Sequence, residues 1–330
     1  MKRGTRLVSP LAGALERFVS FKRSMGLLYR DAEGFMWDLD RLLADRLSPR
    51  EPSITLAIVR EFVARRGMES ESTRAHRLTF IREFCRFRSS EDPRTVVPPP
   101  SLLPIRRPTF VPRVLSLAEG RALLKACLSF PGARCSPLRG VVQGTALSLL
   151  YLAGLRCGEA LDLSNQDVDL ASAVLHIRRA KFGKSRLVPI APDLCARLRD
   201  CRAAVERRLG PREARAPFFP GRRIGSPCSG SALDATFREV LASAGIGRDA
   251  RGRRPRLHDL RHTFAVHRLI LWCRQDEDVG AKLPVLAVYM GHVGLASTQK
   301  YLRVTEDLLG EITRRHQTKF GQIITERPRA

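Results

Sequence analysis

The stretch Leu152-Ala-Gly-Leu-Arg-Cys-Gly-Glu-Ala-Leu161 begins at the end of an apolar run over residues 138–153. This run predicts a buried helix that ends at Gly154. Arg156 comes in the turn after this glycine, where a guanidinium can project into a cleft and bind phosphate oxygens with two parallel donors. Glu159 stands three residues later and is placed to orient Arg156. Taken alone, this stretch favours a structural Arg–Glu pair over a catalytic one.

Two runs of β type, Ala173–Arg178 and Ser185–Ile190, predict a hairpin downstream of that stretch. The hairpin tip carries Lys181 and Lys184, two of only eight lysines in a chain with 50 arginines. An ammonium on a loop can reach a leaving oxygen and donate a proton to it. The alternative is a basic hairpin tip that is simply solvated.

The stretch Leu257-His-Asp-Leu-Arg-His-Thr-Phe-Ala265 places His258 and Arg261 three residues apart, on one face of a predicted helix. Such a pair of donors can hold a phosphate, and the imidazole can move protons near neutral pH. A zinc site built from His258, His262 and His267 is the alternative. The chain has no HExxH pattern and no acidic third ligand at helical spacing nearby, so the sequence disfavours zinc.

The stretch Met290-Gly-His-Val-Gly-Leu-Ala-Ser-Thr-Gln-Lys-Tyr-Leu302 closes the series. Gly291 ends a predicted helix, His292 follows it, and Tyr301 falls on the next short helix. The chain contains only four tyrosines. A lone tyrosine is normally a packing residue, so a chemical role for Tyr301 depends on the cationic residues described above.

In this order, the four stretches resemble the signature boxes of the tyrosine recombinase, or phage integrase, family, with coverage from about residue 113 to 305. The resemblance implies that Tyr301 attacks a DNA phosphodiester and forms a covalent 3′-phosphotyrosine. It implies two phosphate-binding arginines, a lysine that protonates the departing 5′-oxygen, and two histidines that move the phenol proton and bind the phosphate. The implied catalytic residues are Arg156, Arg261, Lys181, His258 and His292, together with Tyr301. Glu159 would support them.

The covalent link conserves the energy of the broken bond, so the chemistry requires no cofactor and no metal in principle. The resemblance favours Lys181 over Lys184 as the proton donor. One departure concerns the 30 residues between Arg261 and His292, which are more than the family pattern suggests. Residues 271–280 look like an insertion, and we interpret them as a surface loop, with a protomer contact as the alternative.

The pattern predicts a mainly α fold with a small antiparallel β-sheet (α+β). Residues 1–95 are predicted to form four amphipathic helices, which make a helical core-binding domain. Residues 96–112 are predicted to be a proline-rich linker, and residues 113–330 the catalytic domain. Ser116 and Glu119 form a capping box that opens a helix. Further helices are expected at Pro192–Leu209, Ser231–Ala244, His258–Trp272 and Leu283–Met290, and a C-terminal oligomerisation helix at Thr305–Ile324.

The net charge of +25 favours a polyanionic partner. Residues 1–112 carry 21 basic and 13 acidic side chains, and residues 113–330 carry 37 and 20, so both parts are basic. We expect double-stranded DNA as the partner. An arginine stripe on the fourth helix is either a solvated face or a phosphate-contacting one. The residues expected to contact DNA are Arg178, Arg179, Lys184, Arg74 and Arg77.

The sequence has no run of about 18 apolar residues, no signal-peptide pattern and no CxxC pair among its eight cysteines. These features predict a cytoplasmic, nucleoid-associated protein without membrane contact. The predicted function is a site-specific recombinase or integrase that moves a mobile element and assembles as a tetramer on DNA, with related recombinases as candidate partners. The alternatives are a non-catalytic DNA-binding relative, a type IB-like topoisomerase and, from the histidines, a zinc-binding transcription factor.

Overall fold

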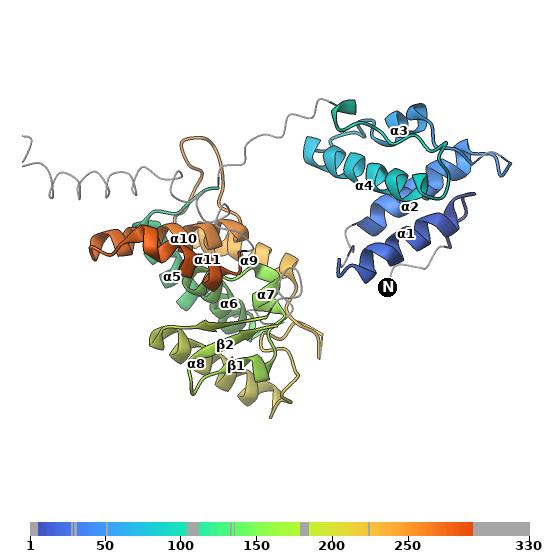
Figure 1. Cartoon of the computed structure of the whole chain (residues 1–330). Helices are drawn as coiled ribbons and strands as arrows, with labels where there is room; N and C mark the ends of the chain where they lie inside the picture. Colours follow the sequence, from blue (N-terminus) through green and yellow to red (C-terminus); the bar gives the residue numbers. More distant parts are fainter. Residues whose placement is uncertain are drawn as a thin grey trace, which may run out of the picture. The chain divides into compact units, whose positions relative to one another are not determined.

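A computed structural model describes residues 6–27, 29, 32–50, 52–103, 112–132, 134, 136–178, 185–223 and 225–292. The chain divides into two compact units, Met1–Phe110 and Val111–Ala330 (Figure 1). Arg179, Lys181, Lys184, Tyr301 and the predicted C-terminal helix lie outside the described residues. The predicted fold, mainly helical with a small antiparallel sheet, is confirmed.

The N-terminal unit is built from the four helices that its apolar spacing predicts: α1 (Ala12–Ser24), α2 (Ala32–Arg46), α3 (Leu56–Phe62) and α4 (Glu71–Ser89). Phe18, Phe62 and Phe84 are fully buried between them. The first residues of the predicted linker pack onto this unit as well. There, Arg82 donates to the Pro98 carbonyl at 2.9 Å, and the short 3₁₀ helix η1 (Pro100–Leu102) brings Leu102 against the core.

The second unit is organised around the apolar helix α6 (Arg139–Ala153), which packs against α5, α8 and α10. Burial on all sides is consistent with its sequence, since a helix that is apolar all round has no solvated face. The other described α-helices of this unit are α5 (Leu117–Leu128), α7 (Cys157–Leu161), α8 (Pro192–Leu209), α9 (Gly230–Ser243), α10 (Leu257–Arg274) and α11 (Val279–Met290).

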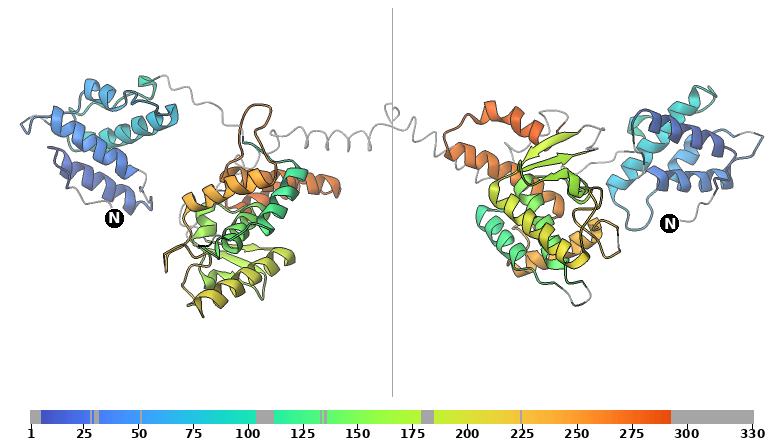
Figure 2. Two further views of the ribbon diagram at one scale, coloured as in Figure 1. Left: turned by 180° about the vertical axis from the view of Figure 1, so that it is seen from behind. Right: turned by 90° about the horizontal axis from the view of Figure 1, so that it is seen from below.

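The three described strands of this unit form one antiparallel sheet in the order β1 (Val168–Asp169), β2 (Val174–Ile177), β3 (Arg186–Pro189), and β1 follows the 3₁₀ helix η2 (Asn165–Asp167). In the register of the predicted hairpin, Leu175 pairs with Val188 and Ile177 with Arg186. Helix α8 runs beside the sheet (Figure 2), where Arg202 donates to the Val168 carbonyl at 2.8 Å. The β2–β3 hairpin therefore belongs to a sheet that is held against α8.

The residues that look like an insertion in the sequence mostly extend the two neighbouring helices. Residues 271–274 continue α10, and α11 begins at Val279, four residues before the predicted start. Asp278 provides the N-cap of α11 by accepting from the Ala281 amide at 3.2 Å. Because α11 begins four residues earlier than predicted, Pro284 lies inside the helix, at its sixth residue.

Candidate active site

The base of the site is the turn at the end of α6. Gly154 has φ +61°, in the left-handed region that side chains with a Cβ rarely adopt. A Cβ at this position would come within 2.3 Å of the Phe264 ring on α10, so the glycine also allows the two helices to approach closely. The turn directs the next residues, including Arg156, toward the start of α10.

Arg261 on α10 ties this turn to the end of α11. Its guanidinium donates to the Gly154 carbonyl at 2.7 Å and to the Met290 carbonyl, and the residue is 2% exposed. Both carbonyls belong to helix C-termini, where the partial negative charge of the helix stabilises a cation. Arg261 therefore lies at the bottom of the site, with its guanidinium held between two main-chain carbonyls.

Glu159 organises two further arginines. The Arg156 guanidinium donates to Glu159 Oε1 at 2.7 Å and to the Gly291 carbonyl at 3.2 Å. Arg186 on β3 donates to both carboxylate oxygens, at 3.1 and 2.8 Å, and to the Tyr289 carbonyl at 2.9 Å. Burial alone would raise the pKa of Glu159, but the hydrogen bonds and charge of Arg186, together with those of Arg156, lower it to about 2. The carboxylate stays ionised and holds both guanidinium groups in place.

Three histidines adjoin these arginines. The rings of His258 and His262 meet edge to face with centroids 4.9 Å apart, and the His292 amide donates to the Ala287 carbonyl just after the left-handed Gly291. Burial, and then the charges of Arg261 and Arg156, lower the pKa of His292 to about 4. Desolvation by the surrounding protein, and then Arg261, also lowers the pKa of His258, although this residue is exposed to solvent. Neutral imidazoles are thus favoured at neutral pH.

The described part of the site thus joins two arginines, a glutamate and two histidines that the sequence singled out. Arg156 and Glu159 come from the start of α7, His258 and Arg261 from the start of α10, and His292 follows α11, so the site joins residues up to 136 positions apart in the chain. A model of the phage integrase family matches residues 114–307, which is more than half of the chain. The chain belongs to the phage integrase family.

Comparisons with individual proteins agree with this assignment. The chain is 34% identical to the putative integrase/recombinase y4rB of Sinorhizobium fredii, and the match covers 95% of this chain and 99% of that protein. It is 30% identical to the tyrosine recombinase XerD of Ralstonia nicotianae over 78% and 77% of the two lengths. A lambda integrase tetramer bound to a Holliday junction has the same fold, with a TM-score of 0.56, 17% identity and coverage of 86% and 77%. The protein is a site-specific recombinase of the tyrosine type, and the predicted family and enzyme class are confirmed.

The β2–β3 hairpin of the recombinase approaches the site through Arg186, which sequence reasoning did not single out. The available signal was its place in the stretch Lys181–Pro189, five positions after Lys181, the expected proton donor. Nothing in that spacing indicates that the side chain turns inward to Glu159. At the other end of the hairpin, Arg178 remains 57% exposed in an ion pair with Asp167.

The three described tyrosines of the recombinase all have structural contacts. Tyr29 donates to Glu83 at 3.0 Å, Tyr289 donates to the Pro189 carbonyl at 3.2 Å, and Tyr151 lies 2.8 Å from a ring nitrogen of His267. Burial raises the pKa of Tyr151 and of Tyr289 to about 12, and it raises that of Tyr29 further. A phenol with a raised pKa is a poor nucleophile, so none of the three suits the attack that the family requires.

One sequence expectation, a DNA contact by Arg77, needs correction. Arg77 is 1% exposed, and its guanidinium donates to the carbonyls of Phe62 and Ala64 and pairs with Glu69, so it is a structural residue of the N-terminal unit and does not offer its charge to DNA. Arg74 is also held within the unit, by Glu71 at 2.9 Å, with 18% of its side chain exposed.

The zinc alternative does not fit the positions of the histidines. Both ring nitrogens of His267 have protein contacts at 2.8 Å, one with the Tyr151 hydroxyl and one with the Leu115 carbonyl. His267 is therefore engaged away from His258 and His262. Within the described ranges no group of three potential ligands is placed to bind a metal.

In that same part of the chain, no helix has both the length and the apolar character that crossing a membrane requires.

Proposed function

We propose that this recombinase cuts and rejoins double-stranded DNA through a covalent 3′-phosphotyrosine at Tyr301. The observation that carries the proposal is the gathering of Arg156, Arg261, His258 and His292 at one site, while the other three tyrosines of the chain are engaged in structural contacts. Tyr301 follows His292 by nine residues, and it is the remaining phenol.

In the proposed reaction, the Tyr301 oxygen attacks the phosphorus and displaces the 5′-oxygen of the next nucleotide. Arg156 and Arg261 neutralise the non-bridging oxygens as negative charge builds in the five-coordinate transition state. His258, kept neutral by its lowered pKa, accepts the phenol proton. Lys181 donates a proton to the departing oxygen, and His292 binds the phosphate or orients its neighbours. A 5′-hydroxyl from a second strand then reverses these steps.

A covalent-trap assay tests the nucleophile. The substrate is a duplex with the proposed cleavage site, nicked close to that site. Cleavage releases a short fragment with a 5′-hydroxyl end, so the strand cannot be rejoined. The protein–DNA adduct therefore accumulates and runs as a shifted band in denaturing gels. Tyr301→Phe should abolish this band without weakening duplex binding. Tyr289→Phe is the matched control, since it removes the hydroxyl of a neighbouring structural tyrosine and should leave the adduct intact. A Tyr301→Phe adduct of normal yield would exclude Tyr301 as the nucleophile.

The arginine roles are tested in the same assay. Losing one preorganised donor to the transition state costs about 3–4 kcal/mol, so Arg156→Ala should lower the rate of adduct formation by a factor on the order of several hundred. Arg261→Ala should do the same, but Arg261 is buried, so Arg261→Lys serves as the variant that keeps a cation there. Cleavage near the wild-type rate in Arg156→Ala would contradict the proposed role.

We further propose that the protein acts as a homotetramer on two DNA duplexes, in the cytoplasm, to integrate, excise or transpose a mobile element. Two cut duplexes require four active sites, and the similar lambda integrase was solved as a tetramer on a Holliday junction. Val285 and Val288 on α11 are 60% and 73% exposed, an apolar face that suits a protomer contact. Analytical ultracentrifugation with a pair of cognate duplexes should detect the tetramer; finding only DNA-bound monomers would contradict it.

A further inference from the structure

The loop that precedes α10 is the most arginine-rich described segment of the chain. It reads Gly247-Arg-Asp-Ala-Arg-Gly-Arg-Arg-Pro-Arg256, five arginines and one acid in ten residues, and we call it the arginine loop. Ten residues with so much like charge repel one another unless the fold supplies counter-charges. None of these arginines is part of the catalytic cluster described above.

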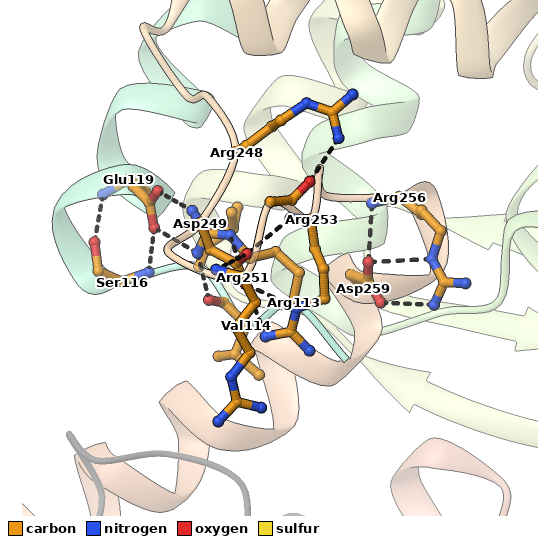
Figure 3. A network of polar contacts seen from close by, with 12 residues as sticks. Arg113, Val114, Ser116, Glu119, Arg248, Asp249, Arg251, Arg253, Arg256 and Asp259 are labelled. Atoms are coloured by element: carbon orange, nitrogen blue, oxygen red, sulfur yellow. Dashed lines mark hydrogen bonds and ion pairs between the residues drawn. The ribbon is translucent and has the colours of Figure 1, made fainter. Parts of the chain in front are cut away.

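Asp249 holds the arginine loop in a fixed shape (Figure 3). Its Oδ1 accepts from the amides of Arg251 at 3.0 Å and Arg253 at 2.8 Å, and its Oδ2 accepts from the Arg253 side chain at 2.9 Å. The Asp249 amide donates in turn to the Arg253 carbonyl at 3.0 Å. One carboxylate therefore closes the loop, and the hydrogen bonds from Arg253 lower the pKa of Asp249 to about 2.

Two further contacts fix the loop on the catalytic domain. On one side, Arg113 lies 4.0 Å from Asp249 and pairs with Glu119 of the α5 capping box at 2.5 Å, as Figure 3 shows. On the other side, Arg256 is the N-cap residue of α10 and pairs with the buried Asp259 at 3.2 Å. The loop is thus rigidly continuous with the helix that carries His258 and Arg261.

The remaining arginines of the loop point their charge outward. Arg248, Arg251 and Arg254 are exposed, and within the described residues the guanidinium groups of Arg251 and Arg254 have no hydrogen-bond or ion-pair partner. A cavity of about 520 Å³ opens between the loop and the end of α9, and Arg254 lines it together with Arg238, Arg248 and Arg256. Its one acidic wall residue, Asp234, is paired with Arg238.

We propose that the arginine loop binds backbone phosphates of the DNA duplex beside the phosphate that is cut. The proposal rests on the proposed function only in taking DNA as the partner. Guanidinium groups without counter-ions match phosphate oxygens in charge and geometry. Because the loop ends at the N-cap of α10, phosphates bound there would set the duplex in register with Arg261. Backbone contacts position the DNA and carry no base specificity of their own.

The test compares the salt dependence of DNA binding in the full-length chain. The probe is a fluorescein-labelled 40-base-pair duplex of mixed sequence, titrated by anisotropy over a range of KCl concentrations in a Tyr301→Phe background that cannot cut. Each lost phosphate contact lowers the slope of log K against log salt by about 0.9. Arg251→Ala/Arg254→Ala should therefore lower it by about 1.8. Arg207→Ala/Arg208→Ala on α8 removes the same charge from another exposed surface and should change the slope by less than half of that.

A second variant tests whether the shape of the loop matters. Asp249→Ala adds one positive charge and removes both side-chain oxygens that close the loop. If the loop binds phosphates as a preorganised element, this variant should bind the duplex several-fold more weakly; tighter binding would show that only total charge counts and would overturn the proposal. An unchanged slope in the double arginine variant would also overturn it. Failure of the parent chain to bind duplex at all would instead refute the DNA function itself.

Discussion

Replacing Glu159 by glutamine tests how the arginines of the site are held. The carboxylate side chain is 7% exposed and receives hydrogen bonds from both Arg156 and Arg186. The contacts lower its pKa from 4.5 to about 2, and at about 1.4 kcal/mol for each tenfold change this corresponds to about 3 kcal/mol of folding free energy. Breaking a buried ion pair from one side costs a similar amount, about 3–5 kcal/mol, because the remaining cations lose their counter-charge.

The pH dependence of this contribution has a definite sign. A carboxyl whose pKa is lower in the folded state binds fewer protons there, so its stabilisation is complete above pH 4.5 and is lost as the pH falls toward about 2. Glu159→Gln should therefore be less stable than the parent by about 3 kcal/mol at neutral pH, and the difference should shrink in acid.

The assay uses the two tryptophans of the chain, one in each unit. In a Trp37→Phe background, fluorescence of Trp272 on α10 reports urea unfolding of the catalytic domain alone. With a slope of about 2–3 kcal/mol per molar urea, the midpoint should fall by about 1 M. Glu206→Gln, an exposed carboxylate on α8, is the control and should stay within about 0.5 kcal/mol. A midpoint shift for Glu159→Gln no larger than that of the control would refute the reasoning.

Three further changes are expected to have measurable effects. Gly154→Ala forces a Cβ into the left-handed region and against the Phe264 ring, so the same fluorescence assay should show a loss of more than about 1 kcal/mol. Arg77→Ala leaves two carbonyls and Glu69, whose side chain is 14% exposed, without their partner and should cost the N-terminal unit about 3 kcal/mol by Trp37 fluorescence; the exposed Arg86→Ala should be nearly neutral. Because burial and then His258 lower the pKa of His262 to about 4, the unfolded state binds more protons below pH 6.5, and the catalytic domain should lose stability as the pH falls from 6.5 to 4. His262→Asn should flatten that decline, and an unchanged decline would contradict it.

Sequence patterns located the helices best where local capping rules act. The capping box at Ser116 opens α5, the left-handed Gly154 ends α6, and α8 spans the predicted Pro192–Leu209. Each of these boundaries is set by hydrogen bonds within a few residues, which local sequence encodes. The five-residue α7 and the two-residue β1 escaped prediction because elements so short have too few residues to show a period.

The roles of individual arginines were harder to predict, because they depend on contacts between distant segments. Arg77 and Arg86 lie on the same basic helix, yet one is buried against Phe62 and Glu69 and the other is exposed. Arg186 likewise meets Glu159 across 27 residues of sequence and the Tyr289 carbonyl across 103. In a chain with 50 arginines, composition cannot distinguish a structural guanidinium from one that binds a ligand.

The way the fold balances charge supports the proposed binding of a phosphate at the site. Three arginines, Arg156, Arg186 and Arg261, converge there, and the Glu159 carboxylate pairs with the first two. The rest of the balance comes from main-chain carbonyls at the ends of α6 and α11, which carry only partial negative charge. Dipoles of this kind hold guanidinium groups in place without neutralising them. The site therefore keeps a net positive charge. The proposed phosphate, held by two arginines and gaining negative charge in the transition state, would supply the counter-charge.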